Sequence, residues 1–382
     1  MTMPSQATSR PRILSAVRLE NTSLLLGLLG LAVGAAVGVS GLSETRPLFG
    51  NDSIGNMAAL AALVAAVVSG LITLTWVTPV NRPWFRSLRW WRLLLNVLGL
   101  TLLHAMLALL TTLAAFAVFQ NAFEGLALDR WAGAFWVAAA GGLWGYITAS
   151  SAMSLTTHSL SVLLLFLLGA GALSSASSAS EPRWWDLRFS ALGTSSDFSG
   201  LTFNMTLLVT GIALTTVGDF LAHDLGVWAV GAGERAWKVT AVRAAMLSFG
   251  VLVALVALIP VDVNKEWHDT AAQSLVLVFA VALVSFPIMF RRMTGSFQAV
   301  TLVIAALLVM LLVLYEGVDY LNTTAFEMGA GAAVFLWLLL FIRTVTAAVE
   351  ELPHTTSEVA RAPGAEAVEP VPSTDRAVTS ES

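Results

Sequence analysis

The chain of 382 residues contains no cysteine, and only 12% of its residues carry a charged side chain. The absence of cysteine excludes disulfides, thiolate metal ligands, iron–sulfur clusters and a cysteine nucleophile. A soluble protein has about 25% charged residues, so this chain has too few charges to cover a globule that faces water. The net charge of −4 and the pI near 5.7 also argue against nucleic acid as a partner.

Several motifs that bind nucleotides or carry out hydrolysis are missing as well. There is no Walker loop, no glycine pattern that opens a helix after a strand to bind a dinucleotide, no GxSxG and no HExxH. An ATP-driven pump or a kinase is therefore excluded, unless a partner protein supplies the nucleotide-binding domain. The sequence predicts neither a cofactor nor a metal site.

Long apolar stretches fill most of the sequence, since 57% of the residues are hydrophobic and the mean hydropathy is +0.79. A transmembrane helix needs about 20 apolar residues, because an α-helix rises only about 1.5 Å per residue. Ten stretches have roughly this length: Leu24–Ser43, Met57–Pro79, Leu93–Phe119, Ala132–Thr156, Leu160–Ser178, Leu201–Ala222, Arg243–Val261, Thr270–Phe290, Ala299–Leu314 and Met328–Val349. We predict an all-α polytopic bundle of ten transmembrane helices.

The basic residues support this count, because cytoplasmic loops of membrane proteins are enriched in Lys and Arg. With the N-terminus in the cytoplasm, ten crossings place fifteen of the twenty Lys and Arg residues on the cytoplasmic side. The fourth and fifth stretches are separated by little more than Thr157, His158 and Ser159. If these two stretches formed one helix, every later loop would lie on the opposite side of the membrane, and the basic residues would no longer favour the cytoplasmic side. We therefore predict ten crossings and expect both termini in the cytoplasm.

This topology divides the chain into four parts. Residues 1–23 form a short cytoplasmic segment, and the first helix is too long for a cleaved signal peptide, which favours a retained signal anchor. Residues 24–158 form a four-helix module and residues 159–350 a six-helix domain. Residues 351–382 are rich in Pro, Ala, Glu, Ser and Thr, so we predict a disordered cytoplasmic tail.

Few ionisable residues lie inside the predicted helices, where a charge is costly and marks a candidate site. His104 lies in the middle of the third helix and either bonds to a neighbouring helix or takes part in a proton relay or ligand site. Asp219 lies in the sixth helix, four residues before His223, with which it could pair. His104 and Asp219 are candidates for a polar pathway through the membrane.

The predicted outer ends of the last six helices carry most of the remaining polar residues. His268 with Asp262 or Asp269 could act as a general base held by a carboxylate, or these carboxylates could bind a hard cation. The alternative is that these loops are simply solvated and that their tryptophans belong to the interfacial aromatic belt. The candidate catalytic residues are His268, Asp262, Asp269 and Ser190, and the candidate ligand-binding residues are Asn204, Trp185, Asp186, Glu316, Asp319 and Glu327.

The loop between the second and third helices alternates cations with aromatic residues, from Arg82 to Arg92. Anionic lipid headgroups attract such a segment by about 1 kcal/mol per cation. We interpret it as a cytoplasmic segment that fixes topology and anchors the chain at the membrane surface.

Two segments carry a resemblance to a known family. They are the run from Trp184 to Asp224, with Ser190-Ala191-Leu192-Gly193 and Phe203-Asn204, and the segment from Pro260 to Ala272. On the basis of these segments, the part of the chain that contains the last six helices resembles a family of bacterial and archaeal multi-pass membrane proteins catalogued as domain of unknown function 998. The resemblance implies a helical membrane fold, and because it brings no established reaction, no catalytic role transfers from it.

Three functions agree with these observations. The first is a plasma-membrane protein, in a bacterial inner membrane, that binds or handles a lipid or lipid-linked cell-envelope molecule at an extracytoplasmic pocket. The second is a secondary transporter, and the third is a non-catalytic subunit or scaffold with another membrane protein as its partner. Membrane lipids are the expected partners in each case.

Overall fold

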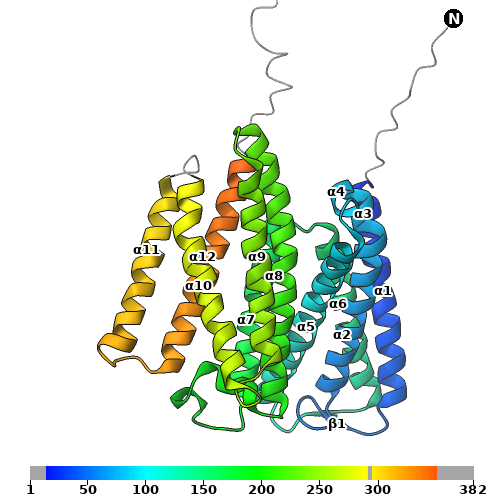
Figure 1. Cartoon of the computed structure of the whole chain (residues 1–382). Coiled ribbons are helices and arrows are strands. Elements are labelled where there is room, and N and C mark those ends of the chain that lie inside the picture. The colour runs from blue at the N-terminus through cyan, green and yellow to red at the C-terminus, as the bar shows by residue number, and fades with distance from the viewer. Residues whose placement is uncertain (1–13, 291–294, 351–382) are drawn as a thin grey trace, which may run out of the picture.

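Residues 14–290 and 295–350 are described by a computed structural model, and they are almost entirely helical (Figure 1). The predicted tail at residues 351–382 lies outside the described residues. The long helices are α1 (Ala16–Gly41), α2 (Ile54–Ile72), α5 (Trp90–Ala122), α6 (Arg130–Met153), α7 (Thr157–Ser177), α8 (Phe198–Gly231), α9 (Ala236–Leu258), α10 (Lys265–Met289), α11 (Gly295–Leu312) and α12 (Thr323–Glu350). The short elements are β1 (Arg46–Pro47), η1 (Thr73–Val77), α3 (Thr78–Asn81), α4 (Pro83–Arg86), β2 (Ala127–Leu128), η2 (Trp184–Asp186), η3 (Phe189–Thr194) and η4 (Val313–Gly317).

The long helices run up and down side by side, so the bundle has two ends (Figure 1). We call one of them the arginine end, because α3, α4 and the first turn of α5 lie there with Arg82, Arg86, Arg89 and Arg92. The other is the sheet end, where β1 and β2 pair antiparallel with Arg46 opposite Leu128. The start of α1 and the end of α12 both lie at the arginine end.

Nine helices in the described part of the chain are long and apolar enough to cross a membrane. This finding fits a multi-pass membrane protein. Each of the ten predicted stretches lies on a separate long helix, but α6 is not among these nine. Its glycines, tryptophans and hydroxyl groups lower its hydropathy, although it packs inside the bundle against α1 and α2. The count of ten crossings and the orientation of the termini stay predictions.

Glycine explains how α6, despite its lower hydropathy, packs closely in the bundle. Gly27, Gly30, Gly34 and Gly38 form one face of α1, and α6 lies directly on this face. A Cβ atom added to Gly30 would lie 2.3 Å from the carbonyl oxygen of Gly141. Only residues without a side chain allow two backbones to come this close, which is how helices associate in lipid.

The turn between α6 and α7 confirms that these are two helices, but it lies three residues earlier than the sequence analysis placed it. The residues predicted to separate them, Thr157 to Ser159, form the first turn of α7. Thr156 accepts a hydrogen bond from the backbone N–H of Ser159, whose side chain accepts one from the backbone N–H of Thr156. This capping box satisfies backbone donors that a helix start leaves free, so the helix begins earlier.

The largest hydrophobic core surrounds α8 and takes residues from α5 as well as from the last six helices. Leu100, Leu103 and Leu107 of α5 belong to this core, together with Val209 and Leu214 of α8. Helix α5 therefore joins the first helices to the rest of the bundle. It also brings its first turn beside α8 and α9 at the arginine end, where the candidate site lies.

Candidate functional site

An ionic cluster joins α5, α8 and α9 at the arginine end. Arg92 and Asn96 come from the first two turns of α5, Asp219 from α8 and Arg243 from α9. The Arg92 guanidinium donates to both carboxylate oxygens of Asp219, with an Nε–Oδ2 distance of 3.2 Å, and Asn96 Nδ2 donates to Oδ2 at 3.1 Å. Arg243 Nε lies 3.6 Å from Asp219 Oδ1. We call these four residues the ionic cluster.

The two arginines of this cluster are held very differently. Arg92 forms a two-pronged interaction with Asp219, the geometry in which arginine binds a carboxylate most strongly. Arg243 Nε is beyond hydrogen-bond distance from Asp219 and, although it is buried, has no hydrogen-bond partner. Unpaired buried donors are rare in proteins, because each one loses its hydrogen bond to water. One carboxylate therefore serves two cations, and one cation is left incompletely paired.

A cavity of about 580 Å³ opens at the surface beside the ionic cluster. It reaches Asp219 and Arg243 at its polar side, while its remaining walls come mostly from apolar residues of α8 and of the segment around α4. The lining residues are Trp84, Ser87, Leu88, Asp219, Ala222, His223, Gly226, Val227, Val230 and Arg243. We call it the arginine-end cavity. Its volume is within the range of small-molecule sites, about 300–1,000 Å³.

Pro83 determines the position of the aromatic wall of this cavity, which contains Trp84. Proline at the first position of α4 ends α3 and turns the chain, which carries Trp84 against α8. The Trp84 ring stacks on the imidazole of His223, with ring centroids 4.4 Å apart, and lies edge-on to Phe220. Asp219 and His223 thus do not pair with each other, because each has a partner on another segment.

A second pair of charged residues, Arg82 and Asp224, lies near the same wall. Asp224 accepts a hydrogen bond from Thr157 at the start of α7, and the guanidinium of Arg82 lies 5.9 Å from the centre of the Phe220 ring. Burial lowers the pKa of Arg82, while the charge of Asp224 opposes this shift. Arg82 and Asp224 therefore balance each other's charge and hold α4 against α7 and α8.

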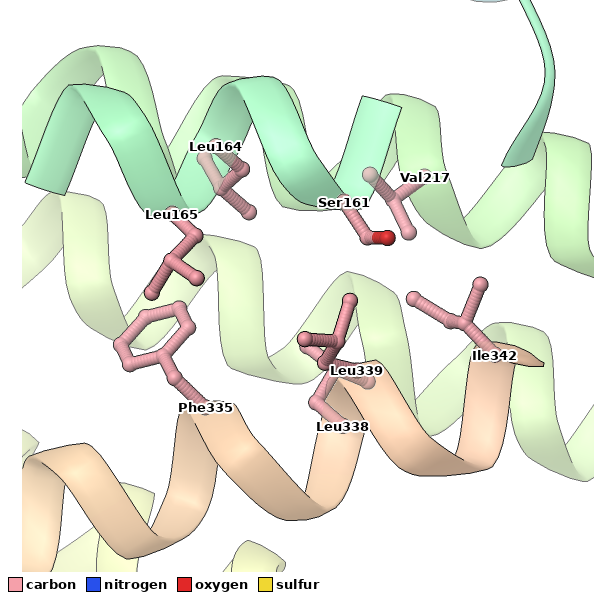
Figure 2. A pocket seen from close by; sticks show the side chains of 8 residues that line it. All are labelled: Ser161, Leu164, Leu165, Val217, Phe335, Leu338, Leu339 and Ile342. Carbon is pink, nitrogen blue, oxygen red and sulfur yellow. The ribbon is translucent and has the colours of Figure 1, made fainter. Parts of the chain in front are cut away.

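A smaller cavity between α7, α8 and α12 cannot hold a ligand (Figure 2). Its volume is about 10 Å³, which is about the space for one water molecule. Leucines, valine, isoleucine and Phe335 line it, and the hydroxyl of Ser161 is already used as a donor to the His158 carbonyl. This contact is packing rather than a site.

His104 is buried between α5 and α6, away from the arginine-end cavity. Its Nδ1 lies 2.8 Å from the carbonyl oxygen of Leu100, and its Nε2 lies 2.9 Å from Oγ of Ser151. Both ring nitrogens therefore have partners. Such a bond between helices is what a neutral histidine contributes to packing in a membrane protein.

At the sheet end, His268 and Glu327 both hold backbone groups. His268 is 5% exposed, and its Nδ1 lies 2.7 Å from the carbonyl oxygen of Ile259. Glu327 Oε2 accepts the backbone N–H of Phe189 at 2.6 Å, which ties η3 and Ser190 to α12. Among the described residues, no hydrogen bond joins His268 to Asp262 or Asp269, so the expected base and carboxylate are not connected.

The other predicted residues at this end also contact loops or face outward. Asn204 donates to the Gly193 carbonyl and Asn322 to the Trp185 carbonyl, both at 2.8 Å. Asp186 pairs with Arg183, Asp269 pairs with Lys265, and Asp262, Glu316 and Asp319 are exposed. In the part of the chain that the structure describes, no group of three or more His, Cys, Asp or Glu side chains could hold a metal ion.

Arg92, Arg243 and Trp84 are not among the candidate site residues that the sequence predicts, because in sequence they look like parts of a topology signal and of a span boundary. A usable signal was present, since Asp219 and these arginines lie at the same predicted depth on different helices. Comparison of the chain with protein-family models, curated proteins and solved structures found no match. The assignment of function therefore rests on the geometry of the arginine-end cavity.

Proposed function

We propose that this multi-pass membrane protein binds a lipid, or a lipid-linked molecule, with an anionic headgroup in the arginine-end cavity. The observation that supports this proposal is a single cavity that joins a charged side to an apolar rim. Arg243 lies at the charged side, and Val227 and Val230 lie at the rim. The sequence predicts the lipid at the opposite end, where some candidate side chains bond to backbone groups and Asp262, Glu316 and Asp319 are exposed.

The shape of the cavity fits an amphiphile better than a fully polar solute. Val227 and Val230 are 46% and 85% exposed in the last two turns of α8, and Leu247 and Val251, one and two turns after Arg243 on α9, are 45% and 47% exposed. A hydrocarbon chain that leaves the cavity along Leu247 and Val251, toward the middle of the bundle, would stay in contact with apolar side chains, and burying apolar surface is favourable. The headgroup would then lie against Arg243, in the position where anionic headgroups meet basic residues at a membrane surface.

We propose that the arginine end faces the cytoplasm, because basic residues concentrate there, and that the membrane is a bacterial plasma membrane. Single cysteines test this orientation cleanly, since the chain has none of its own. In the variants Arg86→Cys and Glu266→Cys the new thiols are exposed at opposite ends of the bundle. A membrane-impermeant maleimide added to intact cells should label position 266 and not position 86. Labelling of position 86 instead would show that the arginine end faces outward and would contradict this orientation.

A cavity-filling variant tests lipid binding itself. A Cβ atom at Gly226 meets nothing within 4 Å, so Gly226→Leu places a side chain in the cavity without disturbing the backbone. Gly169→Leu on α7 is the matched control, because its Cβ is also free of contacts and lies away from the cavity. Native mass spectrometry should detect a tightly bound lipid on the wild type and on Gly169→Leu, but not on Gly226→Leu. Equal lipid occupancy in all three would refute the proposal.

A secondary transporter is the second candidate function, and Asp219 is the observation that favours it. Asp219 is the one acidic residue that lines the arginine-end cavity in the described chain, and it lies within a helix long enough to span a membrane. A transporter would move solute in proteoliposomes, and Asp219→Asn would stop it. A lipid-binding protein would show no such flux.

The resemblance of the last six helices to domain of unknown function 998 stays a prediction, and neither candidate depends on it.

A further inference from the structure

The fixed charges around the arginine-end cavity do not cancel. The charged residues that line the cavity or interact with its lining are Arg82, Arg92 and Arg243, with three positive charges, and Asp219 and Asp224, with two negative ones; Arg86 and Arg89 are exposed and do not line it. Arg82 and Asp224 balance each other behind the cavity wall, and Arg92 and Asp219 form a close pair. The remaining charge is on Arg243. A half-buried charge that shares its acid with another cation is incompletely neutralised, so this position favours a ligand with a single negative charge.

The geometry also distinguishes which arginine is free to bind that ligand. Arg92 already uses its guanidinium on both oxygens of Asp219, and it is not among the residues that line the cavity. Arg243 lines the cavity, its side chain is 43% exposed, and its Nε has no hydrogen-bond partner. Arg92 therefore positions Asp219, whereas Arg243 can turn its donors toward a ligand.

The carboxylates add a second selection, against headgroups that carry an ammonium group. Both oxygens of Asp219 accept hydrogen bonds from Arg92, and Asn96 donates to one of them as well. Asp224 accepts the hydroxyl of Thr157. An ammonium headgroup would thus meet the Arg243 cation, while Asp219, the one acid in the described cavity lining, is already paired with Arg92, and like charges at close range repel.

We propose that the lipid bound in the arginine-end cavity has a phosphodiester headgroup with one negative charge and no positive charge, and that Arg243 binds its phosphate. This inference rests on the proposed lipid-binding function and names the class of lipid. Arginine suits the role, since its planar donor pair matches two phosphate oxygens. A phosphomonoester, with up to two charges, would need a second free cation in the cavity wall, but Arg92 is held by Asp219, and the exposed Arg86 and Arg89 do not line the cavity.

Headgroup selectivity can be measured with a reporter at the rim. Val230→Cys places a single thiol on the exposed rim for an environment-sensitive fluorophore, and Leu302→Cys on α11, 72% exposed, provides the same label far from the cavity. The full-length labelled protein in mild detergent is titrated with short-chain phosphatidylglycerol, phosphatidylcholine and phosphatidate. We expect phosphatidylglycerol to bind at least about tenfold more tightly than the other two, with no saturable signal at position 302.

Variants of the arginines then test the assignment to Arg243. Arg243→Gln should reduce the preference for phosphatidylglycerol over phosphatidylcholine to less than about twofold while phosphatidylcholine still binds, which also shows that the variant is folded. Arg243→Lys should keep part of the preference. Arg86→Gln is the matched control, because Arg86 is exposed on α4 and does not line the cavity.

The possible outcomes separate the two proposals. If none of the three lipids gives a saturable signal at position 230, the lipid-binding function itself is wrong. If all three bind equally, or if Arg243→Gln keeps the full preference, lipid binding stands and the inference about the headgroup is wrong. Tighter binding of phosphatidate than of phosphatidylglycerol would likewise overturn the assignment of a singly charged phosphodiester.

Discussion

Removing Asp219 should destabilise the bundle more than removing either arginine, because the ionic cluster has two cations and one anion. The Asp219 side chain is 10% exposed and that of Arg92 is 18% exposed, so water screens their charges poorly. Leaving a buried charge without its partner costs about 3–5 kcal/mol of unfolding free energy. Arg243 is partly exposed, which places Asp219→Asn near the lower value, about 3 kcal/mol.

Arg92→Gln should cost less, about 1.5 kcal/mol, which is typical of the loss of hydrogen bonds to a charged group. Asp219 would keep the amide of Asn96, and Arg243 needs to move only a few tenths of an ångström from its 3.6 Å separation to form a hydrogen bond. The double variant should lose less stability than the sum of the two single variants, since no unpaired anion and only one cation remain.

Denaturation in mixed micelles, followed by the fluorescence of the thirteen tryptophans, measures these differences. Lys265→Gln is the control, because its pair with Asp269 is exposed at the sheet end and such pairs contribute about 0–1 kcal/mol. If Arg92→Gln proved as costly as Asp219→Asn, the two-to-one arrangement of charges would not be what stabilises this end of the bundle.

Three further predictions concern the packing and the loops. Gly30→Ala should lose about 1–3 kcal/mol by forcing α1 from α6, whereas Gly169→Ala should be neutral or stabilising, as micelle denaturation can measure. Hydrogen bonds from neighbouring serines lower the pKa of Asp197 from 3.8 to about 2, so its contribution to stability is complete above about pH 4 and is lost as the pH falls toward 2. Stability curves of Asp197→Asn should lack this dependence, and a wild-type curve without it would contradict the assignment. Ser151→Ala should cost about 0.6–1.7 kcal/mol through His104 while leaving lipid binding unchanged.

The helices could be predicted from the sequence because each contains a long apolar run, but their ends could not. The third predicted stretch began at Leu93, while α5 begins at Trp90, and the sixth ended at Ala222, while α8 continues to Gly231. Helices continue beyond the apolar run wherever polar side chains find partners, as Asp224 does with Thr157. Hydropathy carries no information about such partners.

The candidate site was harder to predict, because its residues are far apart in the chain. Arg92 and Asp219 are separated by 127 positions, and only the packing of α5 against α8 brings them together. Asp219 stood out as an ionisable residue inside an apolar stretch, but its partners looked like ordinary cytoplasmic charges. At the sheet end, His268 and Asp269 are adjacent in sequence, but His268 lies against the Ile259 carbonyl and Asp269 pairs with Lys265, so closeness in sequence does not predict a bonded pair.

The most direct test of the account is a density map of the protein in nanodiscs that contain phosphatidylglycerol. We predict a phosphate-sized feature within about 3 Å of the Arg243 guanidinium, with hydrocarbon density leaving the cavity along Leu247 and Val251 of α9. A cavity that contains only water, with Arg243 turned to hydrogen-bond Asp219, would contradict the account.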